Sequence, residues 1–103
     1  MKIFKELNKL GYKHYTENTV EELDDLPLDS EERIMEQALV LRWFREKYGI
    51  GSWIHHYFDM DKGTFIYSYV LTLPHRGEEY VYDTHEEAEL ACLIKLIELV
   101  KKK

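Results

Sequence analysis

The sequence predicts an α+β domain in which a long helix and a C-terminal helix accompany a three-stranded antiparallel meander. Segments 29–49 and 84–101 carry apolar residues at helical spacing. Between them, aromatic and β-branched runs alternate with turn residues, as strands do. We predict a single domain over residues 1–103, consisting of a short N-terminal helical extension with an acidic connection (1–28) and an α-β-β-β-α core (29–101) whose C-terminal helix packs on one sheet face.

Composition and charge exclude several classes of function. The net charge is −6, and nucleic acid or an anionic membrane would need a cationic surface. A single cysteine, Cys92, provides neither a disulfide framework nor a cysteine zinc cluster. The N-terminus lacks the apolar run of a signal peptide, and no segment has the length of a membrane span. We therefore expect a cytoplasmic protein with no cofactor.

The N-terminal segment carries two local helix signals. Residues 2–10 place four apolar side chains at helical spacing, and Gly11 follows as a stop. Thr19 and Glu22 have the spacing of a capping box at the start of a second, short helix. The acidic run from 17 to 29 is expected to be a solvated loop.

The long helix is expected to begin at Asp29 or Ser30 and to end at Gly49. Its first apolar stripe, which we expect to face the core, consists of Ile34, Ala38, Leu41, Phe44 and Tyr48. Its second stripe consists of Met35, Leu39 and Trp43. A helix with two apolar stripes needs two surfaces to pack against.

The hairpin follows from two aromatic-rich runs separated by the sequence DKG. A three-residue loop with Gly63 in the left-handed conformation is a common hairpin connection. It would place Met60 opposite Thr64 and Phe58 opposite Ile66. After a second turn at the sequence PHRG, residues 78–83 are expected to return as the third strand.

The sequence WIHHYFDMDKG (53–63) suggests a metal site, but strand geometry argues against one. Side chains alternate along a strand, so His55 and His56 point to opposite faces of the sheet. Asp59 shares a face with His55 but lies roughly 13 Å away, at ~3.3 Å per residue. Asp59 and Asp61 flank a turn, where aspartate hydrogen-bonds its own backbone. We expect no metal site here.

The predicted register gathers aromatic side chains on the other sheet face. That face would carry Trp53, His55, Tyr57, Tyr67, Tyr69, Tyr80 and Tyr82. Exposed aromatic patches mark interfaces, so we predict these seven residues to bind a protein partner. The alternative is that residues 1–28 cover this face. No basic residue lies among the seven, which disfavours nucleic acid.

The C-terminal helix is expected to be capped by Thr84 and Glu87 and to carry only a narrow polar arc. A helix this apolar must be covered on two sides, so we predict a homodimer. The predicted dimer interface consists of Met35, Leu39, Trp43, Leu90, Leu93 and Ile97. Cys92 lies on an apolar stripe and is expected to be a buried small hydrophobe rather than a nucleophile.

Two sequence motifs carry a resemblance. The first runs from Gln37-Ala38 to Trp43-Phe44-Arg45-Glu46-Lys47-Tyr48, and the second is Tyr82-Asp83-Thr84 followed by Glu86-Glu87-Ala88. Over roughly residues 27–101 the chain resembles small uncharacterised proteins encoded by phages and mobile elements of gut bacteria. The resemblance implies a bacterial or viral cytoplasmic setting and brings no activity and no functional residue.

The chain shows no Gly-rich phosphate loop, nucleophile elbow or His-Glu zinc helix. The function predicted from sequence is therefore a non-enzymatic protein-interaction module that forms a homodimer, with another protein as a further candidate partner. The alternative is a small hydrolase or metal-dependent enzyme that uses Asp and His residues near the hairpin tip.

Overall fold

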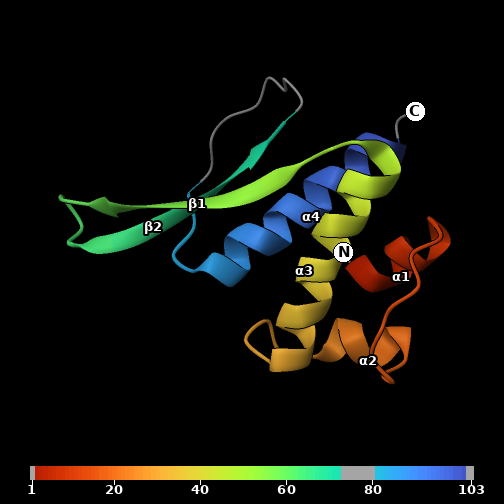
Figure 1. The fold of residues 1–103 in the computed structure, drawn as a ribbon. Helices are drawn as coiled ribbons and strands as arrows, with labels where there is room; N and C mark the ends of the chain where they lie inside the picture. The colour runs from red at the N-terminus through yellow and green to blue at the C-terminus, as the bar shows by residue number, and fades with distance from the viewer. Residues whose placement is uncertain (1, 73–80, 102–103) are drawn as a thin grey trace.

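The computed structural model describes residues 2–72 and 81–101. The elements in chain order are α1 (Ile3–Lys9), α2 (Val20–Asp25), α3 (Glu31–Tyr48), β1 (Ser52–Asp59), β2 (Thr64–Leu71) and α4 (His85–Lys101). The fold is α+β, as predicted, with the long helix and the C-terminal helix in the expected places (Figure 1).

The helix boundaries follow from local hydrogen bonds. The Thr19 hydroxyl accepts from the Glu22 N–H, and the Glu22 carboxylate accepts from the Thr19 N–H, which confirms the capping box. The Ser30 hydroxyl accepts from the Arg33 N–H at the start of α3. Gly49 ends this helix in the left-handed conformation, with φ at 72°.

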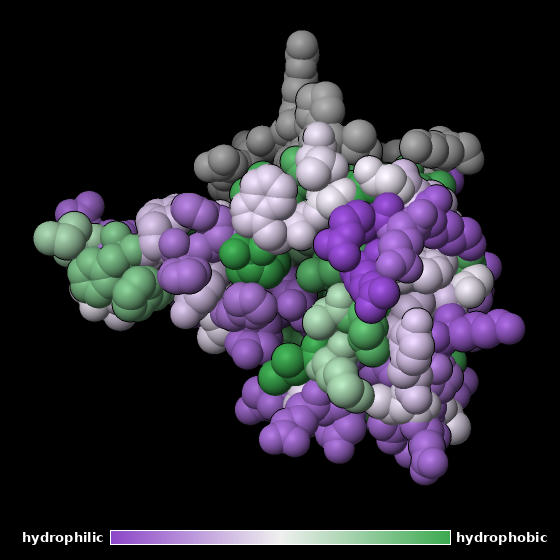
Figure 2. All heavy atoms as spheres, viewed as in Figure 1, coloured by the Kyte–Doolittle hydropathy of each residue, from purple (hydrophilic) through white to green (hydrophobic). Residues whose placement is uncertain are grey.

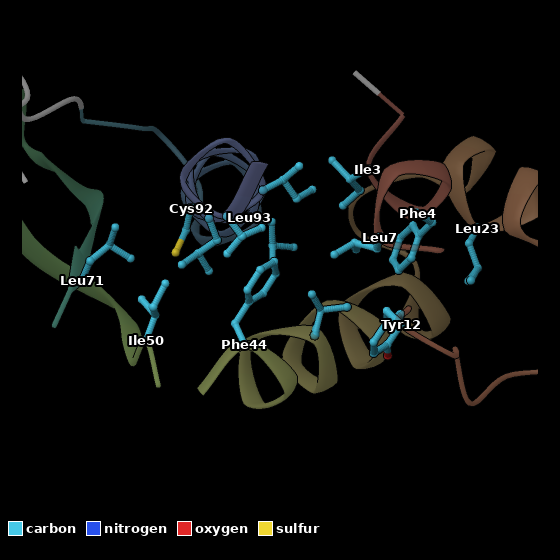
Figure 3. Close-up of a cluster of buried hydrophobic side chains, with 14 residues drawn as sticks. Ile3, Phe4, Leu7, Tyr12, Leu23, Phe44, Ile50, Leu71, Cys92 and Leu93 are labelled. Carbon is cyan, nitrogen blue, oxygen red and sulfur yellow. The ribbon is translucent and has the colours of Figure 1, made fainter. Parts of the chain in front are cut away.

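Helix α4 lies at the centre of the molecule. It contacts both strands on one side and α1 and α3 on the other (Figure 1). Figure 3 shows Ile50 and Leu71 on the strand side of α4, and Phe4 and Leu7 on the side of α1. The α4 side chains buried by these neighbours are Ala88, Glu89, Cys92, Leu93, Leu96, Ile97 and Val100. A helix that is apolar on two sides is thus covered on two sides by its own chain.

The N-terminal segment is part of this core. Ile3, Phe4 and Leu7 of α1 and Leu23 of α2 are fully or almost fully buried, as is Tyr12 in the connection between the two helices. The helical spacing seen in residues 2–10 therefore marks a packed helix. This segment supplies the second cover that α4 requires.

The predicted core face of α3 is partly wrong: Phe44 is buried and Leu41 and Tyr48 pack against the core, but the N-terminal half of the stripe does not. Ile34 is 37% exposed and Ala38 is exposed, whereas only Phe44 of the predicted stripe is fully buried. The buried residues of α3 are Arg33, Glu36, Gln37, Val40 and Phe44. Apolar spacing could not reveal this face, because three of its five residues are polar and are buried with hydrogen-bond partners.

Within residues 2–72 and 81–101 the sheet has two strands; the predicted third strand is not found there, and the predicted register is wrong. Asp59 pairs with Thr64, so the loop is Met60–Gly63, one residue longer than expected. Gly63 has the expected positive φ, 70°. Of the predicted third strand, Tyr82 forms an isolated bridge with Tyr67, while residues 78–80 lie outside the described residues.

The packing of α1 makes a prediction about stability. Replacing Leu7, which is completely buried, by alanine should cost about 2–5 kcal/mol, because the cavity lies inside the shared core. Replacing the exposed Asn8 of the same helix by alanine should cost less than about 0.5 kcal/mol. Urea denaturation of both variants measures the difference. A Leu7→Ala cost similar to that of Asn8→Ala would mean that α1 is not part of the cooperative core.

Candidate interaction surface

The observed register divides the predicted aromatic surface between the two sheet faces. A shift of one residue in pairing moves one strand's side chains to the opposite face. The face toward α4 carries Ile54, His56, Phe58, Phe65, Tyr67 and Tyr69, with Tyr82 paired beside Tyr67. The outer face carries Trp53, His55, Tyr57, Ile66, Ser68 and Val70. The seven residues predicted to form one surface therefore do not share a face, and Tyr80 lies outside the described residues.

The predicted residues on the two faces also differ in exposure, although each face is mixed: Ile66 on the outer face is buried, and Phe58 and Phe65 on the other face are about half exposed. Trp53 and Tyr57 on the outer face are 51% and 41% exposed, and His55 is exposed as well. Tyr67 and Tyr69 are half-buried, and Tyr69 packs against the core. The N-terminal helices lie beyond α4 from the hairpin, so the described part of residues 1–28 is packed on the core instead of on the sheet (Figure 1).

The outer half of the hairpin projects from the body of the molecule. Residues 56–65, here called the hairpin arm, extend past α4, and a hydrophobic patch lies at their tip (Figures 1 and 2). Phe58 and Phe65 are directly paired across the strands, with ring centroids 5.3 Å apart in an edge-to-face arrangement. Each is about half exposed, and Met60 in the loop is 84% exposed. The arm is therefore an exposed apolar surface held on regular secondary structure.

Asp59 and His55 have structural partners in the hairpin. Asp59 Oδ1 accepts from the N–H groups of Asp61 and Lys62, at 2.9 and 3.2 Å, which confirms the predicted turn role of Asp59. His55 and His56 lie on opposite faces, as strand alternation requires. The His55 ring lies against Tyr57, with centroids 5.5 Å apart. Within residues 2–72 and 81–101, no group of three or more His, Cys, Asp or Glu side chains is arranged to hold a metal ion.

The residues predicted to form a dimer interface also lie in different environments. Leu93 and Ile97 are completely buried inside the chain, where both belong to the hydrophobic core. Leu90 is partly buried against the same core. On α3, Met35 is exposed, while Leu39 and Trp43 line a surface pocket together with Tyr15, Arg42 and Glu46.

A buried carboxylate connects α3 to the N-terminal segment. Glu36 is completely buried and accepts three hydrogen bonds of 2.7 Å, from the Tyr12 hydroxyl and from the backbone N–H groups of Tyr15 and Thr16. Burial and the bond to Glu36 raise the pKa of Tyr12. In the sequence this role is marked only by the apolar Val40 one helical turn after Glu36.

A second polar cluster joins α2, α3 and α4. Arg33 Nε donates to Gln37 Oε1 at 2.9 Å, and Gln37 Nε2 donates to Glu89 Oε1 at 3.0 Å. Arg33 Nη1 also donates to the carbonyls at the end of α2, those of Leu23, Asp24 and Leu26. Burial raises the pKa of Glu89 and outweighs the bond from Gln37, which lowers it. These groups are bound to one another inside the fold, so we assign them a structural role.

Cys92 is completely buried, as the sequence predicted. Burial raises the pKa of its thiol to about 12, although the nearby Ser52 hydroxyl opposes the shift. A thiol with such a pKa stays protonated at neutral pH, and the thiolate is the nucleophilic form. Cys92 therefore acts as a small apolar core residue.

Comparison with protein-family models, curated proteins and solved structures finds no match for this chain. Among the described helices, none is long and apolar enough to span a membrane. The assignment of a function therefore depends on the geometry of the described residues, and above all on the hairpin arm.

The raised pKa of Glu89 predicts a dependence of stability on pH. The folded state binds this proton more tightly than the unfolded state, whose carboxyl titrates near 4.5, so stability falls as pH rises through the folded pKa. Glu89→Gln keeps an acceptor for Gln37 and removes the buried charge. Its free energy of unfolding, relative to that of the unmodified protein, should therefore be higher at pH 7 than at pH 4.

Urea denaturation at the two pH values measures this difference, and Glu98→Gln serves as the control because Glu98 is an exposed carboxylate of the same helix. A Glu89→Gln effect that is the same at both pH values would contradict the assignment.

Proposed function

We propose that this chain is a non-enzymatic, cytoplasmic protein-interaction module that binds its partners through the hairpin arm. The observation that carries the proposal is the pairing of Phe58 with Phe65, both about half exposed, on an arm that projects beyond the helical body. A second copy of the chain is proposed as one partner. The bacterial or viral setting is proposed on the motif resemblance alone.

Binding of a partner to the arm would be favourable, because it would cover exposed apolar side chains at the tip. An isolated two-stranded hairpin is marginally stable in water, and this one has helix support only near its base. Its tip nevertheless presents Phe58, Phe65 and the almost fully exposed Met60. Exposed apolar patches of this kind mark interaction sites, since covering them with a partner removes apolar surface from water. The core does not use these side chains, so a partner can bind them without disturbing the fold.

The alternative function, an enzyme that uses Asp and His residues near the hairpin tip, is not supported by the contacts of these side chains. Asp59, the carboxylate of β1, is occupied by two backbone N–H groups of the loop. His55 shares its face but lies four residues away along the strand, roughly 13 Å at ~3.3 Å per residue. An acid–base pair must lie within hydrogen-bond reach of one reacting group. We therefore retain the interaction module as the proposed function.

The proposal predicts a separation of binding from stability. The double substitution Phe58→Ser with Phe65→Ser should cost no more than the roughly 3–5 kcal/mol of truncating one fully buried phenylalanine, because each ring is about half exposed. The same variant, immobilised as bait, should lose the proteins that the unmodified chain captures from a lysate of its source cells. Denaturation and mass spectrometry of the captured proteins give the two readouts.

The matched control replaces two exposed apolar residues of α3, in the double variant Ile34→Ser with Met35→Ser. This variant should capture the same proteins as the unmodified chain. Equal loss of capture in both variants would show nonspecific adhesion, and full capture by the arm variant would refute the arm as the binding surface.

A further inference from the structure

The edge of β1 that faces away from β2, its outer edge, is a second feature of the hairpin, and its main-chain hydrogen bonding can be worked out from the structure. The Tyr67 N–H donates to the Tyr82 carbonyl at 2.9 Å, and the Tyr82 N–H donates to the Tyr67 carbonyl at 2.8 Å. The main-chain groups of Tyr67 therefore point away from β1. Because Tyr67 is opposite His56 in an antiparallel pair, the N–H and C=O of His56 point away from β2.

In an antiparallel pair the main-chain groups of successive residues point alternately toward and away from the partner strand, so the direction found for His56 fixes that of its neighbours in β1. The main-chain groups of Ile54, His56 and Phe58 point outward, whereas those of Trp53, His55 and Tyr57 point toward β2. Two hydrogen bonds agree with this pattern, since the carbonyls of Gly51 and Asp59 accept from the far end of β2 and from the loop. Within residues 2–72 and 81–101 no strand pairs with the outer edge of β1.

This edge also lacks the features that keep strands from pairing. Natural edge strands are short, bulged or marked by lysine, proline or inward charges. Strand β1 has eight residues in an unbroken register, and its sequence SWIHHYFD has one charged residue, Asp59, at the end. The opposite edge of the sheet, on β2, is already contacted by Tyr82. The free edge of β1 is thus suited to accept a further strand.

We infer that β1 pairs with β1 of a second copy of this chain, in antiparallel orientation about a two-fold axis at His56. The two hairpins then form one four-stranded sheet. The inference rests on the proposed function of the arm and names its partner and geometry. Both His56 residues are opposite each other, and Ile54 of each copy is opposite Phe58 of the other.

The side-chain pairs support this register. Ile54 packs against the core of its own copy, so the half-exposed Phe58 of the second copy would extend that core. On the outer face, His55 would be opposite the Tyr57 of the second copy, an aromatic pair of the kind that stabilises neighbouring strands. In this register the outward N–H and C=O groups of one β1 strand lie opposite those of the other, so that they can form the hydrogen bonds of an antiparallel ladder.

If two copies pair through β1, their charges favour the antiparallel over the parallel orientation. The chain carries a net charge of −6, so two copies repel each other over most of their surfaces. Strand β1 carries no charged residue other than Asp59. Antiparallel pairing places each Asp59 opposite Trp53 of the other copy, so the two carboxylates lie roughly 20 Å apart at ~3.3 Å per residue. This separation exceeds the Debye length of about 8 Å at physiological salt.

The area available approaches that of a specific interface. Trp53, Tyr57 and Phe58 are each about half exposed, and a fully buried aromatic side chain removes roughly 150–250 Å² from water. Six such rings in two copies offer on the order of 600 Å². The main chain of the two strands and the exposed Met60 bring the total toward the ~1,000 Å² of a specific interface.

The first test uses a proline that blocks the outer edge alone. In His56→Pro the missing N–H is one that points outward, so the pairing with β2 loses no hydrogen bond. Light scattering at tens of micromolar should give the unmodified chain about twice its mass of 12.4 kDa, and His56→Pro the single mass. Circular dichroism checks that the variant is folded. A monomeric unmodified chain, or a dimeric folded His56→Pro, would overturn the inference.

The second test remains decisive if the proline variant fails to fold. Residues paired at the two-fold axis have Cα atoms about 5.5 Å apart, within the range of disulfide bonds. His56→Cys should therefore form a disulfide-linked dimer under mild oxidation, whereas the control Met60→Cys, at a position that is 84% exposed, should link much more slowly. The buried Cys92 does not interfere. Equal linking of the two variants would show random collision and overturn the pairing.

These results separate the inference from the proposed function. A monomeric chain whose Phe58 and Phe65 still capture a lysate protein would refute the self-pairing and leave the interaction module in place. A monomeric chain without arm-dependent capture would refute both.

Discussion

The fold depends on the burial of helix α4, which is apolar on two sides and must be packed against other elements on both. Its buried side chains include Cys92, which lies toward Ile50 on the strand side, and Leu93 and Ile97, which are completely buried in the same core. No helix of this character is stable with one face in water. The chain meets the requirement with the base of the hairpin on one side and with α1 and α3 on the other (Figure 3). The apolar excess of α4 therefore builds the fold of one chain, and any association of two chains must use another surface.

Covering α4 in this way requires polar groups to be buried with it. Glu36 and Arg33 lie on the inner side of α3, where an unpaired charge would be costly. Each is instead bonded to the backbone of the N-terminal segment. Glu36 holds the connection at residues 15–16, and Arg33 holds the carbonyls that end α2. The same bonds that satisfy the buried charges fix the N-terminal segment on the core.

The sequence predicts the features that depend on neighbouring residues. The capping box of Thr19 and Glu22, the stop at Gly49 and the apolar character of α4 all have local causes and are found where expected. The buried face of α3 could not be predicted, because its polar residues are buried only through partners far away in the sequence. The hairpin register was also not accessible. Loops of three and four residues can both end in Gly63 with positive φ, yet they differ by one residue in pairing.

This one-residue difference in register determines which side chains form the candidate site. The predicted register collects tyrosines into one face, whereas the observed register pairs Phe58 with Phe65 at the end of the arm. The strands themselves are visible in the sequence, because aromatic and β-branched residues favour them. The surface they present is not, because side chains change faces with each residue along a strand.

The central claim is that α1, α3 and α4 form one cooperative body from which the hairpin arm projects. Residue-resolved hydrogen exchange under native conditions tests it most directly, since amides that open only on global unfolding share the highest free energy. Amides of Leu7, Val40 and Leu93 should exchange at this common free energy, and those at the arm tip, near Met60, at a lower one. Exchange of the α1 amides at a free energy several kcal/mol below that of α4 would contradict the account.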